Sequence, residues 1–385
     1  MPELPEVEAA RERLERLAKG KRISHVSAEE DSIVFSGVTH ASFATAIEGK
    51  TVREVRRKGK QFYMVLESGP HPLFHFGMSG YSQTKGISAP TYKVPRAKSD
   101  PDEWPPKYMK TTITFADEDG TKVGEWAFCD ARRLGRIKLI ETEIPEEAQV
   151  LTCLGQDPLL DMISIEALAT ALGKRHAPIK AVLLDQNGPI CGLGNWMVDE
   201  ICYQSKIHPA HPSSALAPEE VTTLHTQILL VTTLAVEAKA DAARFPKSWL
   251  FSARWGKGKK GKDTFVLPSG EETPLTFVTV GGRTSAVVTA VQKLPEGLSI
   301  KSRKRKATDE AAKNEGEEES SVVESKQNPM LSPHFGRKKT LPVPPDASPS
   351  KSPATKFELP SLASPTKTEP EKMARPRKSK AAKLD

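Results

Sequence analysis

Cysteine is scarce in this chain of 385 residues, and its few cysteines form no recognisable site. No C-x-x-C pair occurs, and residues 203–385 contain no cysteine; those present are Cys129, Cys153, Cys191 and Cys202. This pattern argues against a cysteine-based zinc site and a disulfide scaffold, and it favours a reducing compartment. No apolar run approaches the ~20 residues of a membrane-spanning helix, and no signal-peptide pattern is present. We therefore expect a soluble, intracellular protein without a membrane partner.

Aromatic residues are also few, at 6% of the chain, and they nearly disappear towards its end. Residues 301–385 contain only Phe335 and Phe357, with 11 Pro, 19 Lys and Arg, and 12 Asp and Glu. Such a segment cannot bury enough apolar surface to offset the entropy lost on ordering. We therefore predict a disordered basic tail over residues 294–385. The positive excess of residues 301–385 equals the net charge of +7, so composition alone does not indicate that residues 1–300 bind DNA.

The first 140 residues have the pattern of one helix followed by strands. Leu4, Val7, Leu14 and Leu17 give residues 2–19 one apolar face, and Gly20 is a helix stop signal. Short β-branched or aromatic segments then predict strands at 23–26, 33–35, 52–57, 62–67, 73–76, 111–115, 123–129 and 136–140. Eight such strands suggest a β-sandwich, interrupted by a Pro-rich loop at 86–108.

The following residues are predicted to be helical, with one hairpin near the end. Helical spacing occurs at 163–172, 179–186, 196–204 and 219–243, and a basic, Gly-rich stretch follows at 244–262. Residues 277–280 and 285–288 flank Gly281-Gly282-Arg283-Thr284 as a hairpin. We therefore predict an α+β protein with a β-sandwich domain at 2–142, a helical domain at 143–245, a basic loop and hairpin at 246–293, and the tail at 294–385.

The sequence Met1-Pro2-Glu3 carries a candidate nucleophile. Pro is small enough that we expect the initiator Met1 to be removed, which exposes the secondary amine of Pro2. An α-amine titrates near ~8 and a Lys amine near ~10.4, so at neutral pH the α-amine is more often free to attack an aldehyde-like carbon. Glu3 could exchange the proton that this chemistry needs. The alternative is that Pro2 and Glu3 only begin the helix, where a proline and an acid are common.

Three polar side chains that could hold a phosphate each follow a glycine. Lys60 precedes a predicted strand, Asn195 precedes a helix, and Arg283 lies at the hairpin tip. A helix start favours anions, and a guanidinium fork fits phosphate with two hydrogen bonds. The alternatives are a solvated edge charge for Lys60, an N-cap for Asn195 and an ordinary surface turn for Arg283.

Eight motifs, taken in order, resemble the formamidopyrimidine-DNA glycosylase (Fpg/Nei) family. They are Pro-Glu-Leu-Pro-Glu-Val-Glu at 2–8, Arg57…Gly59-Lys60, His75-Phe76-Gly77-Met78-Ser79-Gly80, Asp130…Arg132-Arg133, Leu154-Gly155-Gln156-Asp157-Pro158-Leu159, Gly192…Gly194-Asn195…Asp199-Glu200, Ile207-His208-Pro209 and Gly282-Arg283-Thr284. The resemblance spans roughly residues 2–293. It implies a helix-flanked β-sandwich joined to a helical domain with a helix–two-turn–helix motif and a finger-like hairpin, which agrees with the predicted strands and helices.

The resemblance implies a bifunctional glycosylase and abasic-site lyase that excises oxidised bases from DNA. Pro2 would attack C1′ of the damaged nucleotide, and Glu3 would protonate the opening sugar or the departing base. Lys60, Asn195 and Arg283 would grip phosphates around the everted nucleotide, and β- and δ-elimination would cut the strand. Double-stranded DNA with oxidised bases or abasic sites is the expected partner of a monomeric protein that needs no metal or cofactor. The expected catalytic residues are Pro2, Glu3, Lys60 and Arg283.

The resemblance also implies contacts with the DNA around the lesion. Met78 would fill the space that the everted nucleotide leaves, since its flexible apolar side chain suits stacking between bases; the alternative is a place in the sandwich core. Arg132 would face the base opposite the lesion and Arg133 a phosphate, the alternative for both being a surface salt bridge. Leu134 stands where many relatives have a Phe wedge, which leaves opposite-base preference open. The expected DNA-binding residues are Asn195, Met78, Arg132, Arg133, Leu134, His75 and Glu6.

Besides Leu134, two further departures from the family pattern affect what the resemblance implies. Because residues 203–385 lack cysteine, the hairpin resembles the zincless finger of the plant, fungal and some animal branches rather than a four-cysteine zinc finger. Residues 244–264 differ from the bacterial lesion-capping loop, so the ranking of substrates is open. We expect ring-opened formamidopyrimidines and further-oxidised guanines such as hydantoins to be preferred over 8-oxoguanine.

The tail contains two basic clusters, at 301–306 and 375–380. Such clusters are typical of nuclear-import signals or of non-specific DNA tethers, the alternative being a solvated run of charge. We therefore expect the nucleus as the location. Two other functions stay open at this point: a non-catalytic protein that binds damaged DNA with the same fold, and a scaffold that works through its tail. The intact Pro2-Glu3 pair favours the enzyme, since a binder has no need of it.

Overall fold

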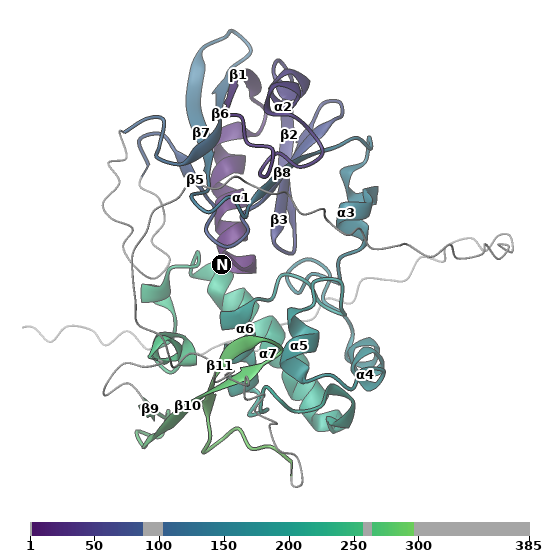
Figure 1. Cartoon of the computed structure of the whole chain (residues 1–385), viewed down its shortest axis with the longest axis vertical. Coiled ribbons are helices and arrows are strands. Elements are labelled where there is room, and N and C mark those ends of the chain that lie inside the picture. The colour runs from purple at the N-terminus through teal and green to yellow at the C-terminus, as the bar shows by residue number, and fades with distance from the viewer. Residues whose placement is uncertain (1, 88–102, 257–263, 296–385) are drawn as a thin grey trace, which may run out of the picture. The chain divides into compact units, whose positions relative to one another are not determined.

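The computed structural model describes residues 2–87, 103–256 and 264–295, in which a pair of β-sheets precedes a group of helices and a smaller sheet (Figure 1). All of these residues belong to one unit of the chain, residues 1–306. The predicted tail from residue 296 onward lies outside the described residues, as do residues 88–102 of the predicted Pro-rich loop and residues 257–263 of the basic stretch.

The first part of the chain forms the predicted sandwich from two antiparallel four-stranded sheets. One sheet has the order β1-β6-β7-β5, with bounds Arg22–Ala28, Met109–Ala116, Lys122–Cys129 and Tyr81–Thr84. The other has the order β2-β3-β4-β8, with bounds Val52–Lys58, Gln61–Leu66, His71–His75 and Arg136–Ile140. Aromatic rings from both sheets meet between them, as where Phe74 of β4 contacts Trp126 of β7 at 5.1 Å between ring centroids. The α+β class and the sandwich are therefore confirmed.

In this first part of the chain, one predicted strand is wrong and two elements were not predicted. Residues 33–35 form a turn with a single bridge at Phe35, because the Asp31 side chain accepts hydrogen bonds from the backbone N–H groups of Ile33 and Val34. An acceptor side chain of this kind competes with strand pairing. The eighth strand is instead β5, and the helix α2 (His40–Ile47) begins at Thr39, whose hydroxyl oxygen accepts from the Ser42 N–H.

Helix α1 (Leu4–Ala18) belongs to both halves of the fold. Val7 and Leu14 are fully buried in the sandwich core, whereas Leu4 is fully buried in the core of the helical part. The Leu4 N–H also donates to the Gly192 carbonyl at 3.1 Å. The first turn of α1 therefore lies where the sandwich meets the helices (Figure 1).

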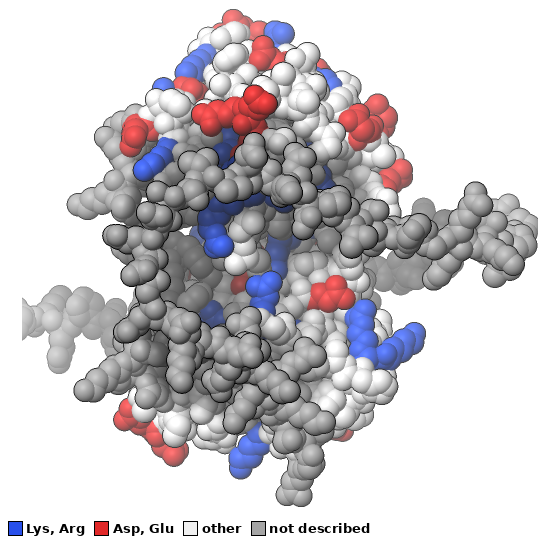
Figure 2. Space-filling view, in the orientation of Figure 1, with Lys and Arg blue, Asp and Glu red and all other residues white. Residues whose placement is uncertain are grey.

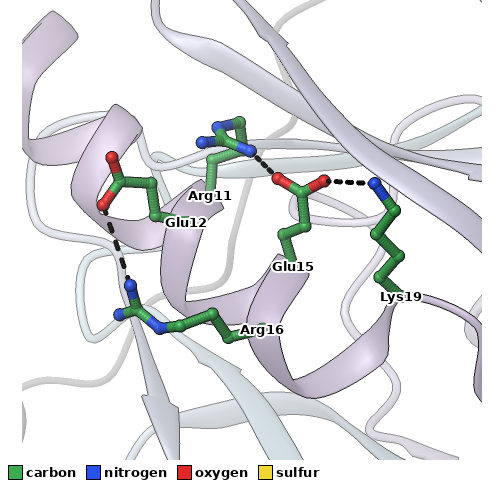
Figure 3. Close-up of a pocket in the computed structure, with 5 residues that line it drawn as sticks. All are labelled: Arg11, Glu12, Glu15, Arg16 and Lys19. Carbon is green, nitrogen blue, oxygen red and sulfur yellow. Dashed lines mark hydrogen bonds and ion pairs between the residues drawn. The ribbon is translucent and has the colours of Figure 1, made fainter.

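The outer face of α1 carries a shallow pocket of about 400 Å³ between charged side chains. Figure 3 shows Glu15 between Arg11 and Lys19, and Arg16 turned towards Glu12. Such pairs three or four residues apart satisfy one another and add little to stability at a surface. The pocket is therefore a solvated helix face rather than a candidate site.

The second part of the described chain is helical and ends in a small sheet. The helices are α3 (Gln149–Thr152), α4 (Ile165–Gly173), α5 (Ile179–Leu184), α6 (Asn195–Gln204) and α7 (Pro218–Glu237), with a 3₁₀ segment η4 (Leu250–Trp255). The predicted helix at 219–243 ends earlier, because the backbone turns at Lys239 and Ala240, which both have positive φ. The small sheet contains β9 (Thr264–Val266), β10 (Glu272–Val280) and β11 (Arg283–Val288). In the described residues, no helix combines the length and apolar character needed to span a lipid bilayer.

Candidate active site

Glu3 occupies a buried seat at the start of α6. Its two carboxylate oxygens accept from the backbone N–H groups of Trp196 at 2.9 Å and Met197 at 3.0 Å, and the residue is only 2% exposed. These donors belong to the free first turn of the helix, where a negative charge is favoured. Glu3, which follows Pro2 in the chain, thus caps a helix that begins nearly 200 residues later.

The alternative role of Asn195, as the N-cap of α6, is wrong. The N-cap of α6 is Gly194, and the capping oxygens come from Glu3. The Asn195 amide instead donates to the Thr284 carbonyl at 3.2 Å, and its Oδ1 is buried with no hydrogen-bond partner among the described residues. A buried acceptor of this kind is available to a donor that arrives with a ligand.

Gly194 leaves the room that Glu3 occupies. A Cβ at residue 194 would lie 2.1 Å from the Glu3 Cδ, although the backbone there is extended and accepts any residue. We expect Gly194→Ala to lower the free energy of unfolding by about 1–3 kcal/mol, because overpacking shifts side chains out of their rotamers. Urea unfolding measures this change. Gly173→Ala is the matched control, since its Cβ would meet nothing within 4 Å; equal stability of the two variants would contradict the tight seat.

Lys60 reaches the same place from the β2–β3 hairpin. Gly59 and Lys60 form the turn between the paired residues Lys58 and Gln61, and Gly59 has φ +57°. Arg57 holds the turn through Asp157, which accepts from the Arg57 guanidinium and from the Gly59 N–H at 2.7 Å. The Lys60 side chain is consequently buried, at 7% exposure, rather than a solvated edge charge.

The buried charges at this place depend on one another. Burial raises the pKa of Glu3, while Lys60 and the two capping N–H groups oppose that rise. Burial lowers the pKa of Lys60, with Glu3 opposing and Arg283 adding to the shift. Burial and the charge of Glu3 raise the pKa of Glu6 to about 8. At neutral pH the site therefore holds a protonated carboxyl at Glu6 and an amine at Lys60 that releases its proton more easily than usual.

Glu6 also fixes the backbone of the first helical turn. Its Oε2 accepts from the Glu3 N–H at 2.8 Å, and its Oε1 is buried without a hydrogen-bond partner in the part of the chain that the structure describes. Pro2, Glu3, Glu6 and Lys60 thus meet in one place, although they come from two elements. The sequence indicated Pro2, Glu3 and Lys60 as catalytic residues and Glu6 as a DNA-binding residue, but not that the Glu6 carboxyl accepts from the Glu3 N–H.

The hairpin tip with Arg283 is fastened to the helices through its backbone. Gly281 and Gly282 form the turn with positive φ, and Asn195 Nδ2 and Lys180 Nζ each donate to the Thr284 carbonyl at 3.2 Å. Arg283 itself is exposed, yet close enough for its charge to lower the pKa of Lys60. The backbone is therefore fixed while the guanidinium is free to bind an anion.

A buried ion cluster under this tip was not found from the sequence. Asp199, 1% exposed, accepts from Lys180 at 2.5 Å and from Arg254 at 2.8 Å. It also lies 3.3 Å from the Ala286 N–H of β11, so it joins α5, α6, η4 and the hairpin. Breaking such a buried pair costs about 3–5 kcal/mol. The Asp199-Glu200 motif was noted, but no local pattern shows which distant cations it meets.

Glu200 should make stability depend on pH. It is fully buried and accepts from the Phe251 N–H at 2.9 Å, and burial raises its pKa from 4.5 to about 7. The folded state then binds the proton more tightly than the unfolded state, so this group's contribution to stability falls as the pH rises from 4.5 to 7. The loss reaches about 3 kcal/mol, at 1.36 kcal/mol per pKa unit.

Urea unfolding at pH 5 and pH 8 tests this dependence. Glu200→Gln keeps an acceptor for Phe251 but cannot ionise, so its stability relative to the parent protein should rise between the two pH values. The exposed Glu237→Gln is the control and should show the same difference at both. A difference for Glu200→Gln that does not change with pH would contradict the raised pKa.

The residues expected to enter the DNA stand on two loops that lie against each other. Met78 and Leu134 are 38% and 39% exposed, and a Cβ at Gly77 would lie 2.2 Å from the Leu134 carbonyl oxygen. Met78 is therefore not a core residue of the sandwich. Arg132, also exposed, precedes Leu134 on the same loop. The structure thus brings these three side chains to one surface, beside the end of β4.

Asp130 locks both loops. This fully buried carboxylate accepts from the Ser79 hydroxyl at 2.6 Å, from the Arg132 N–H at 3.1 Å and from the Gly135 N–H at 2.6 Å. One side chain therefore fixes the loop with Met78 and the loop with Leu134 in a single arrangement. The sequence placed Asp130 within a motif without giving it a role.

His75 lies in the chain just before the loop with Met78, and Arg133 lies between Arg132 and Leu134. His75 ends β4 opposite Gln61, and burial lowers its pKa to about 4, so the ring is neutral at physiological pH. The Arg133 guanidinium donates to Asp31 at 2.9 Å and 3.0 Å. Arg133 thus forms the salt bridge that was its alternative, while nearly half of its side chain stays exposed and accessible to a phosphate.

Positive side chains gather in the hollow that crosses the middle of the face in Figure 2. Among the described residues, no group of three or more His, Cys, Asp or Glu side chains could hold a metal ion. The site therefore offers amines, a guanidinium and carboxyl groups of shifted pKa. Such a set suits proton transfer and attack on a carbonyl-like carbon next to phosphates.

Comparison with known proteins agrees with this arrangement. Residues 1–137 match the model of the formamidopyrimidine-DNA glycosylase N-terminal domain, and residues 154–247 match that of its H2TH domain. A formamidopyrimidine-DNA glycosylase of Arabidopsis thaliana is 41% identical over 294 residues, which cover 76% of this chain and 71% of that protein. One of Enterococcus faecalis is 33% identical over 244 residues, covering 63% of this chain and 79% of that one.

Solved structures show the same fold. The complex of Lactococcus lactis Fpg with N7-benzyl-Fapy-dG DNA matches at a TM-score of 0.57 and 25% identity, covering 76% of this chain and 100% of that one. The complex of the same protein with abasic-site DNA also gives 0.57 and 25%, with 99% of that chain covered. Matches to both domain models and to relatives over most of their length lead to one conclusion. This chain belongs to the formamidopyrimidine-DNA glycosylase family.

Proposed function

We propose that this protein excises oxidised bases, formamidopyrimidines and oxidised guanines among them, from double-stranded DNA and then cuts the strand at the abasic site. The observation that carries the proposal is the seat of Glu3, a buried carboxyl of raised pKa held by two backbone N–H groups beside Pro2 and Lys60. Burial favours the protonated form of this carboxyl, and a carboxyl whose pKa is raised is suited to act as a general acid.

The first step is a displacement at the sugar. Once Met1 is removed, the Pro2 nitrogen attacks C1′ of the damaged nucleotide, and the C1′–N bond to the base breaks. Glu3 supplies one proton, to the departing base or to the ring oxygen of the opening sugar, and the N–H proton that Pro2 loses goes to the other. The products are the free base and an iminium ion that joins Pro2 to the ring-opened deoxyribose. The nucleotide must leave the helical stack for Pro2 to reach it, which costs a few kcal/mol.

Strand scission follows from the iminium ion. Its positive nitrogen acidifies the C2′ proton, so loss of that proton expels the 3′ phosphate by β-elimination. A second, δ-elimination expels the 5′ phosphate, and hydrolysis frees Pro2. Lys60 and Arg283 would hold the phosphates beside the reacting sugar, since the Lys60 charge lies near Glu3 and the Arg283 charge lies near Lys60. A guanidinium binds phosphate with two hydrogen bonds. Asn195 would bind a phosphate through the second hydrogen of its Nδ2, since the first donates to the Thr284 carbonyl.

The duplex would be held open on the other side of the site. We propose that Met78 fills the vacated space, and that Arg132 and Leu134 contact the base opposite the lesion. Their exposure, their adjacency and the common anchor at Asp130 support this assignment. Leu134 gives less stacking area than an aromatic wedge, so we expect weak discrimination of the opposite base. The proposed setting is the nucleus, for a protein that acts as a monomer.

A cleavage assay on labelled duplexes tests the proposal. Duplexes that contain one formamidopyrimidine, one hydantoin, one 8-oxoguanine or one abasic site are incubated with the full-length protein. We expect a gap with phosphates at both ends on the first two and on the abasic duplex, and slower cleavage at 8-oxoguanine. Tight binding of the same duplexes without any cleavage would contradict the proposal and support a non-catalytic damaged-DNA-binding protein.

A further inference from the structure

Asp31 is a buried carboxylate with several hydrogen-bond donors around it. It is 4% exposed and receives five hydrogen bonds or ion contacts. Oδ1 accepts from the N–H groups of Ile33 and Val34 at 3.1 Å each and from Arg133 Nη2 at 3.0 Å. Oδ2 accepts from Arg133 Nε at 2.9 Å and lies 3.0 Å from Lys110 Nζ. The hydrogen bonds from Arg133 and Lys110 hold the pKa of Asp31 well below its ordinary value, against the effect of burial.

This contact takes only one edge of the Arg133 guanidinium. Arginine has five N–H donors, and Asp31 uses the Nε–H and one Nη2–H, so the edge formed by Nη1 and the second Nη2 hydrogen is left. The Arg133 side chain is 49% exposed. A guanidinium held by a carboxylate on one edge can therefore still bind a phosphate oxygen with its other edge.

The backbone at Arg133 explains why an anchor is needed there. Its φ is +55°, a left-handed conformation that is unfavourable for a residue with a side chain. Asp130 fixes the residues on either side through the Arg132 and Gly135 N–H groups. Asp31 adds the only side-chain hydrogen bonds of the Arg133 guanidinium that the described residues contain. Two carboxylates thus hold the loop that carries Arg132 and Leu134.

We propose that Asp31 is a positioning residue for DNA binding, which aims the free edge of Arg133 at a backbone phosphate and so fixes the loop that contacts the opposite base. The inference rests on the proposed function for the identity of the ligand. It assigns a role to a carboxylate that lies outside the catalytic group. An acidic residue near DNA would ordinarily weaken binding, so the proposal predicts an effect of unexpected sign.

Asp31→Asn in the full-length protein tests the sign. The amide keeps an oxygen for the Ile33 and Val34 N–H groups but cannot hold the guanidinium as an anion does. We expect about tenfold weaker binding of a duplex that contains a tetrahydrofuran abasic analogue, as for the loss of one charged hydrogen bond. The slope of log K against log salt should fall by about 0.9, the value for one lost phosphate contact. The exposed neighbour Glu30→Gln is the control, since it removes the same charge without touching Arg133.

A second variant keeps the test valid if Asp31→Asn does not fold. Arg133→Lys keeps the positive charge at an exposed position. A single ammonium group, however, cannot bind Asp31 and a phosphate at the same time in the way that the two edges of a guanidinium do. We expect it to weaken binding as Asp31→Asn does, and we expect the double variant to be no weaker than either single one. In excision assays both variants should bring the rates opposite different bases closer together and should raise KM more than they lower kcat, since neither residue contacts the reacting sugar.

The outcomes separate this inference from the proposed function. If Asp31→Asn binds the duplex as tightly as Glu30→Gln or more tightly, Asp31 only neutralises Arg133 and the inference is overturned. Wild-type affinity of Arg133→Lys, or additive effects in the double variant, would overturn it as well. Binding of the tetrahydrofuran duplex needs no catalysis, so a protein that proves inactive would refute the proposed function without affecting this test.

Discussion

Replacing Glu3 with Gln should reduce the excision of a formamidopyrimidine by about 10²–10⁴-fold, the usual contribution of a general acid. Gln keeps an oxygen for one of the two N–H groups of α6, so the seat is retained in part while the transferable proton is lost. Single-turnover excision measures the effect. Cleavage of a preformed abasic site should fall much less, because its ring-opened aldehyde needs no departing base to be protonated.

The comparison of two substrates makes this prediction specific to acid catalysis. If Glu3 served only to join α1 to α6, its replacement would lower both activities equally through the loss of structure. Glu12→Gln, on the same helix and paired with Lys239 at the surface, should leave both activities unchanged. Undiminished excision by Glu3→Gln would contradict the role of Glu3 as the acid.

Blocking the nitrogen of Pro2 should have the largest effect of all. In Pro2→Leu the large second residue keeps Met1 in place, so the nitrogen at position 2 becomes an amide with no lone pair for attack. Strand scission should fall by about 10³-fold or more, since loss of a nucleophile in a well-studied hydrolase lowers kcat by about 10⁶. The measurement is the initial rate of cleavage of an abasic duplex, with tetrahydrofuran duplex binding as the control for folding.

Pro2→Gly refines this prediction. Gly is small enough for Met1 to be removed, and its primary α-amine titrates near that of Pro, so a nucleophile remains. A secondary amine gives a permanently charged iminium ion, whereas a primary amine gives an imine that must be protonated to withdraw electrons as well. We therefore expect strongly reduced scission and little borohydride-trapped adduct. Full activity in Pro2→Leu, which lacks any free amine at this position, would contradict the mechanism.

Local patterns in the sequence were sufficient for the elements of the fold but not for their contacts. The strands at 52–57 and 62–67 and the helix at 196–204 lie where their patterns predicted them. Residues 33–35 have β-branched and aromatic character, yet they form a turn because a single side chain, Asp31, takes their N–H groups. Thr39, a good N-cap, indicates the start of α2, but the apolar spacing that follows it is too short to predict a helix.

The candidate site shows the same division. Pro2, Glu3, Lys60 and Arg283 were found as separate motifs, and the structure brings their charges together. The interpretation of Asn195 as an N-cap was wrong because Glu3, far away in sequence, occupies that position. Contacts of this kind, like those of Asp199 with Lys180 and Arg254, join residues tens to hundreds of positions apart. No local spacing rule contains them, so only the fold reveals them.

The structure also explains why the glycines of the motifs are required. Gly194 leaves room for Glu3, and Gly77 allows the loop with Met78 to lie against the Leu134 carbonyl. Each of them permits a close approach between segments that are far apart in sequence. These glycines therefore support the site by leaving room for other residues, and they take no part in its chemistry.

The most direct test of the central claim is to locate the covalent bond. The enzyme is incubated with an abasic duplex and borohydride, digested with nuclease and trypsin, and analysed by mass spectrometry. The peptide of residues 2–11 should carry the reduced deoxyribose on the nitrogen of Pro2. An adduct on Lys60, or an unmodified peptide that still begins with Met1 in protein that cuts the strand at full rate, would contradict it.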